Sequence, residues 1–312
     1  MIADWRLAVD EVEPTVLVLG GFLTSPPLYL PLQRRLLERG AAHVVIAPVW
    51  LPDWLLATGR DLGPILTRSG RALLRAGDIA AGSPRSAGAP LLVVGHSAGG
   101  MTARLLTSPE SYAGRRFGAA RRIGAIVTLG TPHRVTPTGR AGGRLAEVAM
   151  AFADRVVPGP AFAPTTGYLA VASRTVLGQA EGDRRARVAY RLYRSIHADA
   201  TVTDAVADGL AGDGPLAELA RGIAGDGVPG DGLVPVASAL LPGVEAIVLD
   251  GIAHGQARHG PWYGSDEALD AWWPRAVEIW RDALRARVAA TGIRPTPRPT
   301  AHPAIVVRLG DR

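Results

Sequence analysis

The sequence predicts a doubly wound α/β fold, in which a mostly parallel sheet of about six strands is covered by helices on both faces. Short, wholly apolar segments alternate along the chain with amphipathic ones. Strands that are apolar throughout are typical of a parallel sheet buried on both sides, and alternation with helices gives right-handed crossovers. The 312 residues, of which 47% are hydrophobic and 20% charged, suffice for a large core.

Six apolar runs are the predicted strands, and they cover residues 15–19, 43–49, 91–94, 123–129, 188–196 and 246–249. The predicted helices cover residues 28–38, 54–75, 98–107 and 267–290. The last of them carries Trp272, Trp273 and Trp280 at helical spacing, which indicates packing in the core.

We expect a single domain over residues 1–293. Between about 134 and 186 the strand pattern lapses into Gly, Pro and Ala-rich segments, which fit an inserted helical cap or a plain connecting helix pair. We adopt the cap as the expectation. The proline-rich residues 294–312 predict an extended or loosely attached tail.

Composition narrows the function classes. The net charge of +6 comes from arginine alone, and the arginines are scattered without interleaved aromatic residues, so nucleic acid is not an expected partner. No cysteine is present, which excludes disulfides and thiolate metal sites. The acidic first 16 residues lack a signal-like apolar run, and no run approaches a membrane span, so we expect a cytoplasmic protein without stable membrane insertion.

Ser97 lies in the pattern Gly95-His96-Ser97-Ala98-Gly99, between a predicted strand and a predicted helix. A sharp turn there exposes the serine as a nucleophile, and the two glycines avoid collisions with the neighbouring elements. The alternative is that Ser97 only caps the helix, and the position of the motif between a strand and a helix favours the nucleophile. We therefore predict a serine nucleophile, with His96 pointing away from it as a packing residue.

An oxyanion hole needs two donors. The Ala98 amide at the helix start supplies one, and the turn Gly20-Gly21-Phe22 after the first strand is placed to supply the other through the Phe22 amide. A dinucleotide site is the rival explanation for glycines after a strand, but the Gly-x-Gly-x-x-Gly spacing is missing. No cofactor is expected.

A serine nucleophile needs a general base, and His254 follows a predicted strand on a loop that can reach Ser97. His259 is the main rival, whereas we expect His133 and His197 to be structural.

The acid that orients the base has two candidates, Asp231 in Gly230-Asp231-Gly232 and Asp226 in the near-copy Gly225-Asp226-Gly227. Both lie in turns, where aspartates usually cap their own backbone. Asp250 lies too close to His254 along the chain to be its natural partner.

Four segments resemble the α/β-hydrolase superfamily, and most closely its lipase and GPI inositol-deacylase-like esterases, including cyanobacterial and chloroplast lipase-like proteins. They are the Ser97 motif, residues 128–133, residues 230–235 and the His254 loop. The resemblance covers about residues 15–280 and implies an α/β-hydrolase fold, a triad of Ser97, Asp231 and His254, and no cofactor or metal. Gly20 stands where a histidine is usual in the oxyanion motif, and the chemistry survives because the donor is a backbone amide.

The sequence therefore predicts a carboxylic ester hydrolase of the esterase or lipase kind, acting on a small-molecule or lipid ester through an acyl-enzyme. Amidase, thioesterase or acyltransferase activity on the same fold is one alternative. A non-catalytic α/β-hydrolase scaffold that binds a ligand or protein is another. Oligomeric state cannot be read from the sequence.

Overall fold

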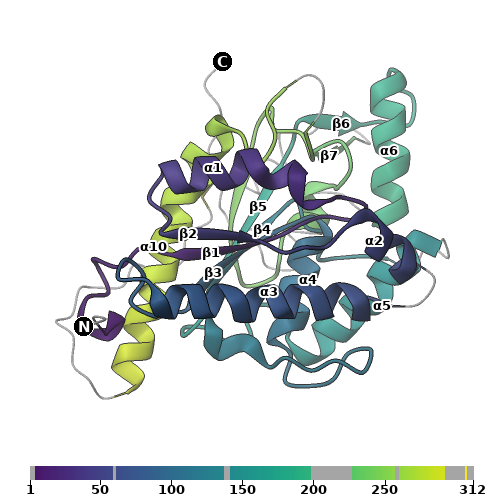
Figure 1. The fold of residues 1–312 in the computed structure, drawn as a ribbon. Helices are drawn as coiled ribbons and strands as arrows, with labels where there is room; N and C mark the ends of the chain where they lie inside the picture. Colours follow the sequence, from purple (N-terminus) through teal and green to yellow (C-terminus); the bar gives the residue numbers. More distant parts are fainter. Residues whose placement is uncertain are drawn as a thin grey trace.

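The central element of this computed structural model is a parallel sheet (Figure 1). The structure describes residues 4–58, 61–136, 141–197, 227–256, 260–291 and 306–307. Seven strands lie in the order β2-β1-β3-β4-β5-β8-β9, and every neighbouring pair in it is parallel. Their bounds are β1 Thr15–Leu19, β2 His43–Ile46, β3 Leu91–His96, β4 Ile123–Leu129, β5 Gly167–Ser173, β8 Glu245–Leu249 and β9 Val306–Val307.

Helices cover both faces of this sheet. Alternate residues of the strands enter two separate apolar cores, as β1 shows with Leu17 and Leu19 in one and Val16 and Val18 in the other. The first core is completed by α3 (Gly63–Gly82), α4 (Ala98–Thr107) and α5 (Ala141–Val156), and the second by α1 (Leu30–Glu38) and α10 (Asp266–Ala290). The doubly wound α/β prediction is confirmed, and the tryptophans of α10 are buried as expected.

A small second sheet lies apart from the central one. The strands β6 (Val176–Gly178) and β7 (Val228–Gly230) pair antiparallel, and α6 (Arg184–Ile196) packs against them through buried Ala189 and Tyr193. Figure 1 shows β6, β7 and α6 grouped at one end of the molecule. The remaining short elements are α2 (Leu51–Thr58), α9 (Val236–Ala239) and the 3₁₀ turns at Trp5–Leu7, Pro26–Tyr29 and Ala119–Arg122.

Two sequence predictions are wrong. Residues 188–196 form most of α6 instead of a strand, because Ala189 and Tyr193 are buried four residues apart while Arg191 between them stays exposed. The core strand that the sequence does not predict is β5, which lies inside the range 134–186 expected to form a cap. The sequence of β5, GYLAVAS, is rich in Gly and Ala and therefore lacks the usual β-branched signal.

The predicted single domain over 1–293 stays a prediction. Within the tail 294–312, the structure describes Val306 and Val307, which pair with Ile247 and Val248 of β8. None of the helices in the described ranges is long and apolar enough to cross a membrane.

Candidate active site

Ser97 lies at a sharp turn between β3 and α4. Its backbone has a φ of 53° and a ψ of −124°, a left-handed value of φ that a side chain disfavours. The Ser97 amide donates to the carbonyl of Leu129 at the end of β4, over 2.8 Å. The Thr131 hydroxyl donates to the Ser97 carbonyl over 2.9 Å. The turn is thus strained and held from two sides, as the sequence predicts for a nucleophile.

Glycines make this turn possible. A Cβ on Gly99 would lie 2.1 Å from the carbonyl oxygen of Leu19, the last residue of β1. A Cβ on Gly95 would lie 2.5 Å from the backbone of Gly100. Neither contact can be accommodated by moving a flexible side chain, so both positions need glycine for α4 to start directly beneath Ser97.

The loop after β1 comes equally close to Ser97. A Cβ added to Gly21 would lie 3.0 Å from the Ser97 Cβ and 3.2 Å from His96 Nδ1. Phe22 follows, with its ring in edge contact with Trp54 at a centroid distance of 5.6 Å. The first amides of α4, including that of Ala98, have no partner within their own helix. Both predicted oxyanion donors therefore belong to backbone segments that flank Ser97.

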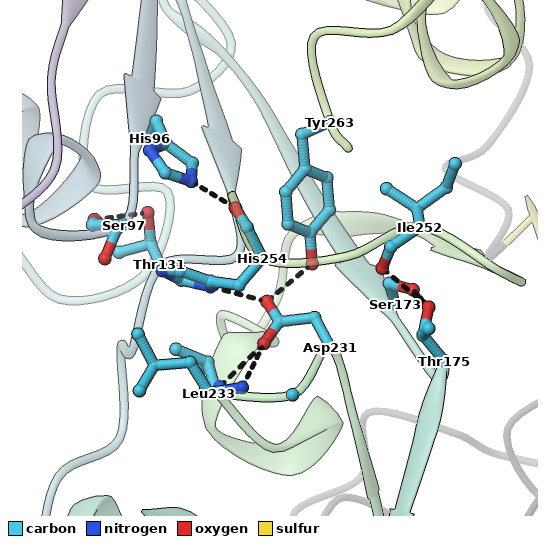
Figure 2. Close-up of polar contacts among 12 residues, drawn as sticks. His96, Ser97, Thr131, Ser173, Thr175, Asp231, Leu233, Ile252, His254 and Tyr263 are labelled. Atoms are coloured by element: carbon cyan, nitrogen blue, oxygen red, sulfur yellow. Dashed lines mark hydrogen bonds and ion pairs between the residues drawn. The ribbon is translucent and has the colours of Figure 1, made fainter. Parts of the chain in front are cut away.

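Asp231 and His254 are in direct contact, although they lie 23 positions apart in the chain. His254 Nδ1 lies 2.7 Å from Asp231 Oδ2, and the His254 amide donates to the Asp231 carbonyl over 3.0 Å. In Figure 2 the His254 ring lies on the side of Asp231 that faces Ser97. Because an ionised carboxylate only accepts, Nδ1 carries the hydrogen and Nε2 keeps a free lone pair. No hydrogen bond joins Ser97 Oγ to His254 among the described contacts, and such bonds are often long without substrate.

The Asp231 carboxylate is buried and fully hydrogen-bonded. Its Oδ1 accepts from the amides of Leu233 and Val234 at 2.9 and 2.7 Å, and its Oδ2 also accepts from the Tyr263 hydroxyl at 3.0 Å (Figure 2). Burial and the nearby Asp231 charge raise the pKa of Tyr263 well above its usual value, so this phenol stays a donor. With His254, four donors around one carboxylate fix its orientation.

Tyr193 of α6 forms two hydrogen bonds that hold the loop carrying Asp231. Its hydroxyl accepts from the Gly232 amide over 2.8 Å and donates to the Val176 carbonyl over 3.1 Å. Burial raises the pKa of Tyr193. The side chain therefore joins the loop that carries Asp231 to strand β6.

His96 connects the two sides of the site. Its Nε2 lies 2.7 Å from the His254 carbonyl, and its Nδ1 lies 2.8 Å from the Tyr29 hydroxyl, which accepts from the Gly21 amide over 2.7 Å. Burial, and secondly the neighbouring His254, lower the pKa of His96 to about 3, so its ring is neutral. A carbonyl can only accept, so Nε2 carries the hydrogen and Tyr29 donates to Nδ1. Sequence reasoning assigned His96 to packing only.

The other candidates from the sequence divide as follows. His133 is buried and bonds Thr128 through Nε2 at 3.0 Å, consistent with a structural role. Asp250 pairs with Arg174 and not with His254. Asp226 and His259, the rival acid and base, lie outside the described residues.

Tyr29, Tyr193 and Tyr263 are site residues that sequence reasoning missed, because a buried tyrosine has no motif that separates it from core packing. No group of three or more His, Asp or Glu in the described ranges could hold a metal ion.

Fold and site together define an α/β-hydrolase architecture, with a serine elbow after β3 and an acid and a histidine on loops that follow the elbow in the chain.

No family model matches the sequence, and no curated protein matches it. Solved structures match by shape. The propeptide form of Bacillus licheniformis lipase BlEst2 has a TM-score of 0.50 at 13% identity, covering 94% of this chain and 53% of that one.

Two further structures are similar at lower scores. The mature form of the same lipase has a TM-score of 0.48 at 14% identity and covers 87% of this chain and 93% of that one. Est1E from Butyrivibrio proteoclasticus with bound ferulic acid has a TM-score of 0.40 at 13% identity, over 86% and 88% of the two chains. At 13% identity the likeness to the propeptide form supports the fold and leaves the activity open.

Proposed function

We propose that the protein is a carboxylic ester hydrolase in which Ser97, His254 and Asp231 form a catalytic triad. The hydrogen bond of 2.7 Å between His254 Nδ1 and Asp231 Oδ2, on the loops beside the strained Ser97 turn, is the observation that carries this proposal. It gives the imidazole the tautomer that a general base needs. The resemblance to lipase and GPI inositol-deacylase-like esterases, and a cytoplasmic location, stay part of the proposal.

The reaction follows from these positions. Ser97 Oγ attacks the ester carbonyl while its proton passes to His254 Nε2, and the negative charge on the carbonyl oxygen is stabilised by the Phe22 and Ala98 amides. The bond between the carbonyl carbon and the alcohol oxygen then breaks, and His254 returns the proton to the leaving alcohol. Water repeats the sequence on the acyl-enzyme, releasing the acid and restoring Ser97.

The catalytic role of Ser97 is tested by Ser97→Ala with p-nitrophenyl butyrate. We expect turnover to fall by about 10³-fold or more, since the serine cannot be replaced in acyl transfer. Circular dichroism and the unfolding midpoint should stay at the wild-type values, because removing one hydroxyl leaves the turn intact. Wild-type turnover by Ser97→Ala would refute the proposal. Equivalent thioester and amide substrates distinguish an esterase from the thioesterase and amidase alternatives.

A further inference from the structure

A cavity of about 590 Å³ opens beside the proposed base, within the size range of small-molecule sites. Its lining includes His254, Asp231 and residues of the first half of α6. None of the lining residues belongs to the loop of Gly20, Gly21 and Phe22. The cavity therefore adjoins the base and not the predicted oxyanion donors.

This position assigns the cavity to one part of an ester. In the proposed reaction His254 gives its proton to the alcohol oxygen, so the alcohol must leave on the side of His254. A cavity that is lined by His254, and by no residue of the loop of Gly20, Gly21 and Phe22, is on that side. It would hold the alcohol portion of the substrate.

Beyond His254 and Asp231, the lining is apolar and carries two positive charges. Val176, Val188, Ala189 and Leu233 supply the apolar surface, and Arg184 and Arg185 supply the charges. Both arginines are exposed at the start of α6, and no ion pair among the described residues involves either of them. Arginine in such a position suits a carboxylate or a phosphate, which it can bind through two parallel hydrogen bonds.

The charge of α6 is one-sided. Five of its 13 residues are arginines, Arg184, Arg185, Arg187, Arg191 and Arg194, and none is acidic. Of the five, Arg184 and Arg185 line the cavity. Arg191 and Arg194 lie further along the same helix and provide a matched control.

We propose that the protein prefers esters whose alcohol portion carries an anionic group, a carboxylate or a phosphate, bound by Arg184 and Arg185. The inference rests on the proposed ester hydrolysis, because that reaction places the alcohol at His254. It names a substrate class for the site.

The test compares 4-acetoxybenzoate with 4-acetoxybenzamide, two acetate esters that differ in the charge of the leaving phenol. The ratio of their kcat/KM values is measured for wild type, Arg184→Gln/Arg185→Gln and Arg191→Gln/Arg194→Gln. Because Arg184→Gln/Arg185→Gln removes two exposed ion pairs with the substrate anion, we expect the ratio to fall about fivefold in this variant. The second variant should keep the wild-type ratio, and so should Arg184→Lys/Arg185→Lys in large part, since the charge is kept.

An unchanged ratio in Arg184→Gln/Arg185→Gln overturns the inference, and so does an equal fall in both glutamine variants, which would show a general effect of helix charge. Raising NaCl from about 20 mM to about 500 mM should lower the wild-type ratio as well, because screening weakens exposed charge pairs. A wild-type ratio that does not respond to salt also overturns the inference, without depending on whether a variant folds.

A binding measurement distinguishes failure of the proposed ester hydrolysis from failure of the proposed preference for an anionic alcohol. Calorimetry with 4-hydroxybenzoate and 4-hydroxybenzamide needs no turnover. Tighter binding of the anion by wild type, lost in Arg184→Gln/Arg185→Gln, supports the inference even when neither ester is hydrolysed. Equal binding of the two phenols contradicts it even when both esters are hydrolysed.

Discussion

His96 donates its Nε2 hydrogen to the backbone carbonyl of His254 over 2.7 Å, although the two residues lie 158 positions apart in the chain. The same ring accepts from Tyr29, whose oxygen accepts from the Gly21 amide. The residue before Ser97 thus ties the loop of the proposed base to the loop of the proposed oxyanion donor. Its neutral, buried ring can make both bonds at once.

Replacing His96 by Leu should lower kcat by about ten- to hundredfold, since small displacements of a catalytic group are costly. The substitution removes both hydrogen bonds and still fills the space beside Ser97 with a side chain. KM should change less than kcat, because His96 does not line the cavity. Steady-state kinetics on p-nitrophenyl butyrate checks this. Tyr29→Phe, which breaks only the bonds on the Gly21 side, should give a smaller loss, and a wild-type kcat in His96→Leu would contradict the positioning role.

Asp231→Asn should lower kcat by roughly 10⁴-fold, the effect seen when a triad acid loses its charge and the histidine takes the wrong tautomer. Asp250→Asn is the matched control, because Asp250 lies on the same stretch of chain as His254 but pairs with Arg174. Its turnover should stay within about threefold of wild type. Comparable losses in the two variants would mean that Asp231 acts only through loop structure.

The stability of the fold should decrease with acid. Burial lowers the pKa of His96 to about 3 and that of His133 well below 6.5. Because both folded-state pKa values lie below the unfolded value of about 6.5, the unfolded chain binds more protons between pH ~3 and ~6.5. The contribution of the two histidines to the free energy of unfolding is therefore complete above pH ~6.5 and is lost as the pH falls through this window.

Urea unfolding at several pH values measures this effect. Each histidine should add up to about 1.4 kcal/mol per pH unit to the slope of the unfolding free energy. His133→Gln should make the slope shallower by that amount at equal m-values. A slope identical to wild type would show that His133 is not buried in the neutral form.

Gly99→Ala should destabilise the protein and remove activity, because the new Cβ would lie 2.1 Å from the Leu19 carbonyl oxygen. Gly82→Ala is the matched control, since at this helix end nothing lies within 4 Å of an added Cβ. Gly82→Ala should leave the unfolding midpoint unchanged or raise it, since the free energy of unfolding can increase by about 0.4–1 kcal/mol. Thermal unfolding followed by circular dichroism compares the two, and equal midpoints would contradict the close approach of α4 to β1.

The sequence predicted the elements whose signal is local. Ser97 followed from a strand, a glycine-flanked motif and a helix, and Asp231 and His254 were named because their loops follow strands. The contact between those two residues was not readable from spacing, because a chain segment of 22 residues separates them. In α6 the alternation of Val188, Tyr190 and Leu192 with other residues resembles a strand, whereas the buried pair Ala189 and Tyr193 shows that it is a helix.

The residues that orient the site were harder to predict. Tyr29, Tyr193 and Tyr263 act through single hydrogen bonds to segments remote in sequence, and a buried tyrosine is usually core packing. The second bond of His96 depends on the carbonyl of His254, which any residue at that position would supply. Such contacts depend on the tertiary arrangement and leave no pattern in the chain.

Covalent labelling of Ser97 tests the central claim most directly. A fluorophosphonate probe, which modifies an activated serine, is incubated with the folded protein, and the modified residue is identified by mass spectrometry of its peptides. Our account predicts stoichiometric modification of Ser97 that is lost in Ser97→Ala and strongly slowed in His254→Ala. A folded wild-type protein that stays unlabelled, or labelling that persists in Ser97→Ala, would contradict it.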